Sequence, residues 1–476
     1  MNDIKLIKKK ISKELKDILV KIKNIKSCTL VGSFNSSNKL ESISDIDIII
    51  IVDKLNEIEF DRILTSLNNF NLNIVGLEKY ELIINSTFGP LKFDGHKKLV
   101  LHTMIYDFDG HKNHVEQSPF TCYDWENNKP LFGSHLKDVY QVGSVQLDDL
   151  ISSRRGLENY LVDLNNKIIS YRQYSFKNEN YSVIKKNHLL DKKHINEYGF
   201  HIMKYILINL MKILTQKNIQ PSLNEITNFY NGKYIVFKPH LKLFKEIYSW
   251  KKNKGNKPIG IIPGVNDFLN SIFKLINEIK IKSNKIDFIR HAKTKLNNGT
   301  FLGIGRNPGI EKELKDSKEI YQIGFSSKMK RTIETLSSFK CNKTYESELL
   351  NEIDYGKCEG MTLQNLKNKY PEIIDDWSNG SDPRFPGGES QNDVLSRLKK
   401  FINKEISNKN MIIVTHLVVL RMLLKRTWSL KLRKCYLINI SHLETLNYIL
   451  YENVLIPNFN SLIRKKIRTN LQRDEF

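Results

Sequence analysis

The sequence predicts an α/β protein of several domains: a small α/β unit, a helical middle domain and a C-terminal open α/β sheet with flanking helices. Three observations support this class. At 476 residues the chain is longer than one hydrophobic core usually supports. Short apolar strands alternate with helical periodicity before residue 110 and again after residue 284. The stretch between them reads mostly as helix, which separates the two α/β parts.

The pattern predicts the elements of the first domain, residues 1–147, in the order helix, strand, strand, helix, strand, strand. Apolar residues at helical spacing predict a helix over residues 4–25, and a short strand is predicted at 29–31. The remaining segments are a strand at 46–52, a helix at 56–70 and strands at 81–85 and 98–106. This order is typical of a small α/β unit.

The rest of the chain is assigned by the same periodicities. We expect a helical domain at 148–255, a linker and helix at 256–283, an α/β domain at 284–455 and a basic tail at 456–476, frayed over residues 463–476. Gly, Pro and Lys mark residues 250–260 as an exposed loop. A helix is predicted over 265–281, and strands over 286–289 and 411–415.

The net charge of +23, from 75 basic and 52 acidic residues, suits anionic partners such as nucleotides and phosphorylated metabolites. Abundant Lys, Asn and Ile also fit a compositional bias of the source genome. No dense patch of Arg and aromatic residues is visible, so the charge by itself does not favour nucleic acid as the partner.

The cysteines and the N-terminus indicate a cytoplasmic protein. Five scattered cysteines without a Cys-x-x-Cys pair disfavour a disulfide framework or a structural zinc site. Charges interrupt every apolar run near the N-terminus, so neither a signal peptide nor a transit peptide is predicted. No window approaches the ~20 apolar residues of a membrane span.

Two carboxylates near the N-terminus suggest a metal site. Asp45 and Asp47 lie two residues apart on a predicted strand, so their side chains share one face. They suit Mg²⁺, which prefers oxygen ligands. Gly32 and Ser33, about a dozen residues earlier, can offer backbone N–H groups and a hydroxyl to the oxygens of a triphosphate. A polar strand edge is the alternative, but the Gly-Ser turn and the apolar run 48–51 favour the functional interpretation.

The segments Val31-Gly32-Ser33 and Ser44-Asp45-Ile46-Asp47-Ile48 resemble the polymerase-β-like nucleotidyltransferase superfamily over about residues 25–110. The resemblance implies that Gly32 and Ser33 bind a nucleoside triphosphate and that Asp45 and Asp47 bind Mg²⁺. The family usually has a third carboxylate on a later strand. Here that strand presents His102, with Asp107 only at its far end, so the general base is an open question.

Histidines cluster around this strand, at His96, His102, His111 and His114. Their spacing matches no zinc pattern, and we expect no zinc cluster there. His102 remains open to two interpretations, a replacement for the missing carboxylate or a core histidine in a domain with weakened catalysis.

A second group of residues suits phosphoryl transfer to histidine. A predicted strand leads directly into Arg290 and His291, and open α/β sheets bind ligands at such strand ends. A nucleophilic imidazole needs one free ring nitrogen and one held by a hydrogen bond. Guanidinium groups can hold phosphoryl oxygens, and a carboxylic acid must protonate the leaving oxygen. His416 ends another buried strand in the same domain.

Five blocks in order, at 290–294, 326–335, 350–360, 386–390 and 411–416, resemble the histidine phosphatase (phosphoglycerate-mutase-like) superfamily over about residues 284–450. The resemblance implies that the domain needs no cofactor. It implies the following roles: nucleophile, His291; phosphate pocket, Arg290, Arg331 and His416; general acid, Glu352; pocket lining, Thr294 and Asn297.

The stretch 351–360 resembles the phosphatase branch more than the mutase branch, because Asp354 stands where mutases have a basic stretch. Two departures are Leu417, where glycine is common after the second histidine, and Arg306, where an acid is frequent. We expect them to alter substrate choice rather than remove the chemistry.

Together the motifs predict a bifunctional enzyme acting on a nucleoside triphosphate and a small phosphorylated metabolite, for example a sugar or polyol phosphate. One alternative is a phosphatase with a nucleotide-sensing, catalytically weak N-terminal domain. Another is an RNA-end-processing enzyme, in which the positive charge would grip nucleic acid. No motif predicts the nucleotide base, the acceptor or the oligomeric state.

Overall fold

The computed structural model describes residues 2–36, 45–89, 97–192, 194–234, 237–253 and 260–472. The chain divides into two compact units, one of residues 1–212 and 217–275 and the other of residues 213–216 and 276–476. The domain boundaries that the sequence predicts at residues 147 and 255 fall inside the first unit and stay predictions. None of the described helices combines the length and apolarity needed to cross a lipid bilayer.

Five strands of the first unit form one sheet in the order β3-β4-β2-β1-β5. β2 runs parallel to β4 and antiparallel to β1. The end of β1 therefore lies beside the start of β2, where Asp47 pairs with Val31 on one side and with His102 of β4 on the other. The strands are β1 (Ile25–Val31), β2 (Ile46–Val52), β3 (Glu81–Asn85), β4 (Lys98–Tyr106) and β5 (Pro130–Gly133). The strands predicted at 46–52, 81–85 and 98–106 are confirmed.

Apolar faces of α1 (Asn2–Leu19) and α3 (Glu57–Asn68) complete the core of this sheet. Leu15 and Ile63 are fully buried against Ile48 and Ile50 of β2. The predicted first helix is too long, because α1 ends at Leu19 and Ile25 already begins β1. Further short helices are α2 (Ser33–Ser36), α4 (Leu72–Val75), α5 (Phe108–Gln117), α6 (Pro119–Trp125) and α7 (Leu136–Val139).

The prediction that residues 148–250 are helical is wrong in one segment. Strands β6 (Ile168–Lys177) and β7 (Asn180–Leu189) form an antiparallel hairpin. Asn178 and Glu179 form its two-residue turn, both with positive φ, as the twist of a hairpin requires. The ring centroids of Tyr174 and Phe60 lie 4.6 Å apart, so aromatic burial against α3 stabilises the strand conformation.

Helices make up most of the remaining first unit. They are α8 (Leu147–Ser152), α9 (Leu157–Asn165), α10 (Ile195–Thr215), α11 (Leu223–Lys233), α12 (Lys238–Asn253) and α13 (Ile261–Lys282). The last residues of α10 and of α13 belong to the second unit. α13 includes the helix predicted at 265–281. The predicted loop at 250–260 overlaps the end of α12, and its residues 254–259 lie outside the described residues.

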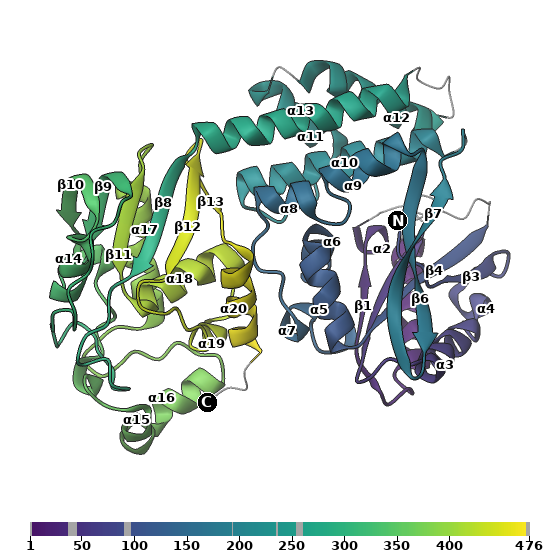
Figure 1. Cartoon of the computed structure of the whole chain (residues 1–476). Coiled ribbons are helices and arrows are strands. Elements are labelled where there is room, and N and C mark those ends of the chain that lie inside the picture. The colour runs from purple at the N-terminus through teal and green to yellow at the C-terminus, as the bar shows by residue number, and fades with distance from the viewer. Residues whose placement is uncertain are drawn as a thin grey trace. The chain divides into compact units, whose positions relative to one another are not determined.

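The second unit contains a six-stranded sheet in the order β10-β9-β11-β8-β12-β13 (Figure 1). The first four strands are parallel, whereas β12 pairs antiparallel with β8 and β13 antiparallel with β12. Its strands are β8 (Asn284–Arg290), β9 (Ile320–Ser326), β10 (Lys340–Glu346), β11 (Met411–Thr415), β12 (Thr445–Tyr451) and β13 (Val454–Pro457). The predicted strands at 286–289 and 411–415 are confirmed.

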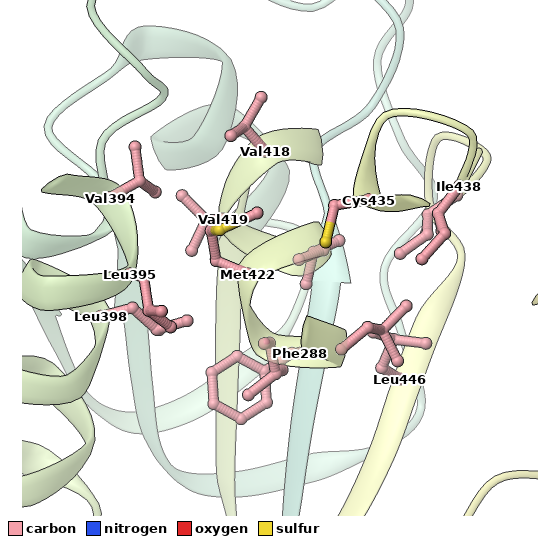
Figure 2. Close-up of a cluster of buried hydrophobic side chains, with 14 of the residues drawn as sticks. Phe288, Val394, Leu395, Leu398, Val418, Val419, Met422, Cys435, Ile438 and Leu446 are labelled. Carbon is pink, nitrogen blue, oxygen red and sulfur yellow. The ribbon is translucent and has the colours of Figure 1, made fainter. Parts of the chain in front are cut away.

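Helices pack on the sheet through an apolar cluster (Figure 2). Phe288 of β8 lies beside Leu398 of α17 and Met422 of α18, and all three are fully buried. The helical segments are α14 (Lys330–Leu336), η3 (Glu348–Leu350), η4 (Gly356–Cys358), α15 (Leu363–Lys369), α16 (Pro371–Ser378), α17 (Gln391–Glu405), α18 (Leu417–Trp428), α19 (Leu432–Cys435) and α20 (Ser461–Leu471).

The prediction of a frayed C-terminal tail is wrong for most of its residues. Residues 461–471 form α20, whose N-terminus is capped by the side chain of Asn460. Ile467 and Leu471 are buried in the apolar cluster of this unit, so they tie the helix to the domain despite its basic residues. Residues 473–476 lie outside the described residues.

Candidate active sites

The Gly-Ser turn lies at the end of β1, beside a carboxylate of β2. Gly32 has a φ of +73°, and a Cβ at this position would lie 2.3 Å from Asp47 Oδ2. Only glycine therefore permits this close approach. Ser33 begins α2 and lines a cavity of about 540 Å³ together with Asp45, Asp47 and His102. The structure thus brings the predicted triphosphate and metal residues together.

Asp45, Asp47 and His102 form a group of possible metal ligands. Asp47 of β2 and His102 of β4 are direct partners across the two parallel strands. One ligand atom from each of the three residues lies within 4.8 Å of the others. The oxygens of Asp45 and Asp47 suit Mg²⁺, whereas the imidazole of His102 could bind a metal only after losing a ring proton. Ser44, which precedes the group in the motif, lies outside the described residues.

His102 carries a positive charge in this arrangement. Its Nδ1 lies 2.7 Å from Asp47 Oδ1, and its Nε2 is within hydrogen-bonding distance of the carbonyl oxygen of Thr87. Both partners accept hydrogen bonds, so both ring nitrogens bear protons. Burial lowers the pKa of His102, but the hydrogen bond and charge of Asp47 outweigh it and raise the pKa above its ordinary value.

Asp107, the other residue considered as the third carboxylate, has a structural role. Asp107 caps α5, where its Oδ1 accepts hydrogen bonds from the Gly110 N–H at 2.8 Å and the Tyr181 hydroxyl at 2.9 Å. Of the described residues, the metal-ligand group includes His102 but neither His111 nor His114. Burial lowers the pKa of His111 to about 4, which is typical of a core histidine. His96 lies outside the described residues.

In the second unit, His291 follows β8 and is almost fully buried. Its Nδ1 lies 2.7 Å from the carbonyl oxygen of Ala292, so Nδ1 bears the proton and Nε2 keeps its lone pair. Nε2 forms no hydrogen bond with another described residue. Burial and then the charge of Arg331 lower the pKa of His291 well below its ordinary value. The imidazole is therefore neutral, as a nucleophile must be.

Arg331 and His416 lie beside this imidazole. The ring centroids of His291 and His416 are 5.1 Å apart, and Arg331 Nε donates to His416 Nδ1 at 3.3 Å. Arg331 is fully buried, and its Nη2 donates to the carbonyl oxygen of Gly303 at 3.0 Å. His416 Nε2 contacts Ser327 Oγ at 2.7 Å. These bonds fix a buried guanidinium next to the nucleophile.

Glu352 follows η3, and its buried carboxyl group lies against the N-terminal end of α18. Its Oε1 accepts hydrogen bonds from the N–H of Ile353 at 2.9 Å and of Val418 at 3.3 Å. Burial raises the pKa of Glu352, although these contacts and the charges of Arg331 and Arg290 oppose the shift. A carboxyl group with a raised pKa can hold a proton for a leaving group.

The remaining predicted residues have identifiable contacts. Arg290 Nη1 donates to the carbonyl oxygen of Ile440 at 2.6 Å, and burial lowers the pKa of Arg290 to about 10. Its Nε is buried and has no hydrogen-bond partner among the described residues. Asn297 Oδ1 accepts from the N–H of Thr294 at 2.9 Å, so these two residues form one turn after the nucleophile. Their predicted contact with substrate stays a prediction.

Arg306, which departs from the family pattern, is paired with an acid from another loop. Its Nε lies 3.2 Å from Glu359 Oε1, and Glu359 also accepts from the N–H of Gly303. The carbonyl oxygen of Gly303 accepts a hydrogen bond from Arg331. The Arg306–Glu359 ion pair therefore holds the loop that orients Arg331. Asp354, the residue that favoured the phosphatase branch, accepts from the N–H of Gly356 at 2.8 Å and shapes its own loop.

The sequence motifs did not predict that His442 lies beside the nucleophile. Its ring centroid lies 5.2 Å from that of His291, and its Nδ1 donates to the His291 carbonyl oxygen at 2.9 Å. Burial lowers the pKa of His442, which leaves a neutral Nε2. The only signal in the sequence was a histidine three residues before a predictable strand, and strand pairing of β12 with β8 is what brings it here.

Comparisons with known proteins agree with both sites. Residues 286–454 match the histidine phosphatase superfamily (branch 1), and residues 8–106 match the nucleotidyltransferase domain. The resemblances inferred from the motifs and the α/β class are therefore confirmed. The chain contains one domain of each kind.

Two curated relatives carry phosphatase names. The chain is 30% identical over 209 residues to 6-phosphofructo-2-kinase/fructose-2,6-bisphosphatase 4 of Rattus norvegicus, covering 40% of this chain and 43% of that protein. It is 35% identical over 114 residues to fructose-2,6-bisphosphatase of Saccharomyces cerevisiae, covering 24% and 25%. The chain thus spans less than half the length of these relatives. The alpha-ribazole phosphatase of Shigella flexneri is similar over 37% of this chain and 94% of its own, with 18% identity and a TM-score of 0.32.

Proposed function

We propose that this chain, which contains a histidine phosphatase superfamily domain and a nucleotidyltransferase domain, is a bifunctional enzyme. One site hydrolyses a phosphomonoester through a phosphohistidine, and the other transfers a nucleotidyl group. The observation that supports the first activity most strongly is the hydrogen bond from His291 Nδ1 to the Ala292 carbonyl, because it leaves Nε2 ready to attack.

The first half-reaction forms a phosphoenzyme. The His291 Nε2 lone pair attacks phosphorus in line with the ester oxygen, while the bond from phosphorus to that oxygen breaks. The guanidinium groups of Arg290 and Arg331 stabilise the charge on the equatorial oxygens. Glu352 gives its proton to the departing oxygen, so the alcohol leaves neutral.

The second half-reaction returns the enzyme to its starting state. Glu352, now ionised, takes a proton from water as the water oxygen attacks phosphorus. The bond between phosphorus and Nε2 breaks, its electron pair returns to the imidazole, and inorganic phosphate leaves. The proton stays on Nδ1, which donates it in a hydrogen bond to the Ala292 carbonyl oxygen throughout, and this keeps the ring in one tautomer.

We infer a small phosphorylated metabolite, such as a sugar or polyol phosphate, as the substrate class. The names of the relatives, which are bisphosphatases of a fructose ester, support a sugar phosphate. The phosphatase is tested with p-nitrophenyl phosphate, a general phosphomonoester. His291→Ala should abolish turnover while leaving the unfolding temperature close to that of the wild type, and full activity of this variant would contradict the proposal.

For the second activity, Asp45 and Asp47 would hold Mg²⁺, and Gly32 and Ser33 would contact the triphosphate. When bound, the metal would supply charge neutralisation at the phosphates. The Gly-Ser turn would position the triphosphate by backbone N–H groups, in the cavity of about 540 Å³. Pyrophosphate release with Mg²⁺, a nucleoside triphosphate and a panel of metabolites tests the activity. Asp45→Asn should abolish release.

A nucleotide-sensing domain is the second candidate for this unit, and one observation favours it. His102 pairs its charge with Asp47, which would have to be released before a metal could use both carboxylates fully. This candidate predicts that the wild type binds a nucleoside triphosphate but releases no pyrophosphate. Measuring binding and release on the same preparation separates the two functions.

A further inference from the structure

Three arginines line the same cavity as the carboxylates of the first unit. Arg154 and Arg155 lie between α8 and α9, and Arg172 lies on β6. The cavity volume of about 540 Å³ is in the range of small-molecule sites, roughly 300–1,000 Å³. None of these arginines belonged to either motif, and the strand that carries Arg172 was not predicted at all.

Backbone hydrogen bonds hold two of these arginines in place. The Arg154 N–H donates to the Gln117 carbonyl oxygen at 2.8 Å, which ties its turn to the end of α5. Arg172 exchanges two backbone hydrogen bonds of 2.7 Å with Phe88, which follows β3. The backbone of these two arginines is therefore anchored to neighbouring segments.

The three guanidinium groups have no partner of opposite charge within the described part of the chain. No ion pair or hydrogen bond joins any of them to a described side chain. Burial and then repulsion from Arg154 and Arg155 lower the pKa of Arg172 to about 10. Partly buried cations that repel one another are costly unless an anion pairs with them.

The other carboxylates of the cavity do not fill this role. Asp163 raises the pKa of Arg172, but its Oδ2 is taken by Ser170 and by the Tyr198 hydroxyl at 2.9 Å. Its Oδ1 lies 4.0 Å from Lys185 Nζ. Glu197 also lines the cavity without forming an ion pair to these arginines. The cavity therefore has room and charge for an anion brought by a ligand.

We propose that Arg154, Arg155 and Arg172 bind the phosphate group of a phosphomonoester acceptor. Guanidinium groups suit this ligand because they can donate two parallel hydrogen bonds to a phosphate. The inference rests on the transferase activity proposed above and defines its acceptor class.

The chemistry balances with the components named. An oxygen of the acceptor phosphate, ionised at neutral pH, attacks the α-phosphorus of the triphosphate. A new bond forms between that oxygen and phosphorus, and the bond from the α-phosphorus to the oxygen bridging it to the β-phosphorus breaks. Pyrophosphate leaves with that electron pair. The product is a nucleoside diphosphate ester of the acceptor.

Calorimetric titration of the full chain with inorganic phosphate tests directly whether these arginines bind a phosphate group. Two sites are expected, because the phosphatase domain binds phosphate as well. Arg172→Gln should weaken one site at least tenfold and leave the other unchanged, and Arg331→Gln should do the reverse. Arg154→Gln repeats the first test at a position on another element, and unfolding temperatures verify that each variant folds.

The source of the phosphate is decided by adding Mg²⁺ and a non-hydrolysable nucleoside triphosphate. If the arginines serve an acceptor, phosphate still binds at the site that depends on Arg172. Loss of that binding in the wild type would mean that the triphosphate occupies the arginines, and unchanged binding in both arginine variants would equally overturn the proposal. Pyrophosphate release is read separately, so a chain that binds phosphate through Arg172 but releases none would refute the transferase instead.

Discussion

The two candidate sites each bury a histidine among charged groups, and the neighbours drive the two imidazoles in opposite directions. His291 lies near Arg331 and Arg290, and burial together with these cations lowers its pKa. His102 lies against Asp47, whose hydrogen bond and charge overcome burial and raise its pKa. The first ring is neutral with a free nitrogen, whereas the second carries protons on both nitrogens.

This difference shows that the residue type alone does not define the chemistry. A histidine ringed by guanidinium groups can attack phosphorus, because the charged form is disfavoured there. The same side chain beside a carboxylate instead acts as a cation that neutralises a metal ligand. Substitutions at Glu352, Gly32, His102 and His442 test this contrast, and we expect their effects to decrease in that order.

Glu352→Gln should give the largest effect, a loss of phosphatase kcat on the order of 10²–10⁴-fold. Glu352 acts in its protonated form, and burial raises its pKa, so the wild type should lose activity as the pH rises through that raised value. The variant cannot titrate and should lack this alkaline decline. A pH profile for hydrolysis of an alkyl phosphomonoester, whose leaving oxygen needs a proton, measures both, and an unaltered decline in the variant would assign it to another group.

Gly32→Ala should destabilise the first unit more than Gly76→Ala does. Both glycines have similar positive φ, +73° and +77°, so both alanines carry a backbone strain of about 1–3 kcal/mol. Only at Gly32 would the new Cβ also meet Asp47, since nothing lies within 4 Å of a Cβ at Gly76. The unfolding midpoint and Mg²⁺ affinity should fall further for Gly32→Ala. Equal losses would argue against a specific contact with Asp47.

His102→Asp should increase Mg²⁺ affinity on the order of tenfold, because it replaces a cation with an oxygen ligand. His102→Asn is the matched control, since it removes the charge without adding a carboxylate. Calorimetric titration with Mg²⁺ measures the change in each variant. A weaker affinity in His102→Asp would indicate that the imidazole itself is needed as a ligand.

His442→Ala should produce the smallest change, a loss of roughly fivefold in kcat/KM, the size of one hydrogen bond. The ring supports the His291 carbonyl and presents Nε2 beside the nucleophile. His442→Asn can restore a donor to that carbonyl and should recover part of the loss. If both variants hydrolyse p-nitrophenyl phosphate like the wild type, His442 has no role in the reaction.

Much of the fold could be predicted from the sequence because local patterns agree with tertiary packing. The apolar runs of β2, β4 and β11 are buried on both faces, so continuous hydrophobicity was a reliable signal. In the structure, a capping box of Ser390 and Asp393 defines the start of α17. The motifs at the ends of β8 and β11 place His291 and His416 at the carboxyl ends of neighbouring parallel strands.

Other features depended on contacts that the sequence does not encode locally. The β6–β7 hairpin was missed because its turn is Asn-Glu rather than Asn-Gly and its polar faces resemble an exposed helix. α20 was read as a tail because its buried Ile467 and Leu471 are few among basic residues. Arg172 and His442 reach their sites only through pairing between strands distant in the sequence.

The central claim is that the neutral imidazole of His291 accepts phosphate. Rapidly quenched enzyme, mixed with p-nitrophenyl phosphate and analysed by mass spectrometry under conditions that preserve acid-labile adducts, tests it directly. We expect a phosphate on His291 that accumulates in Glu352→Gln, which lacks the base that activates water, and that is absent from His291→Ala. Turnover by the wild type with no adduct at His291 in either enzyme would contradict the account.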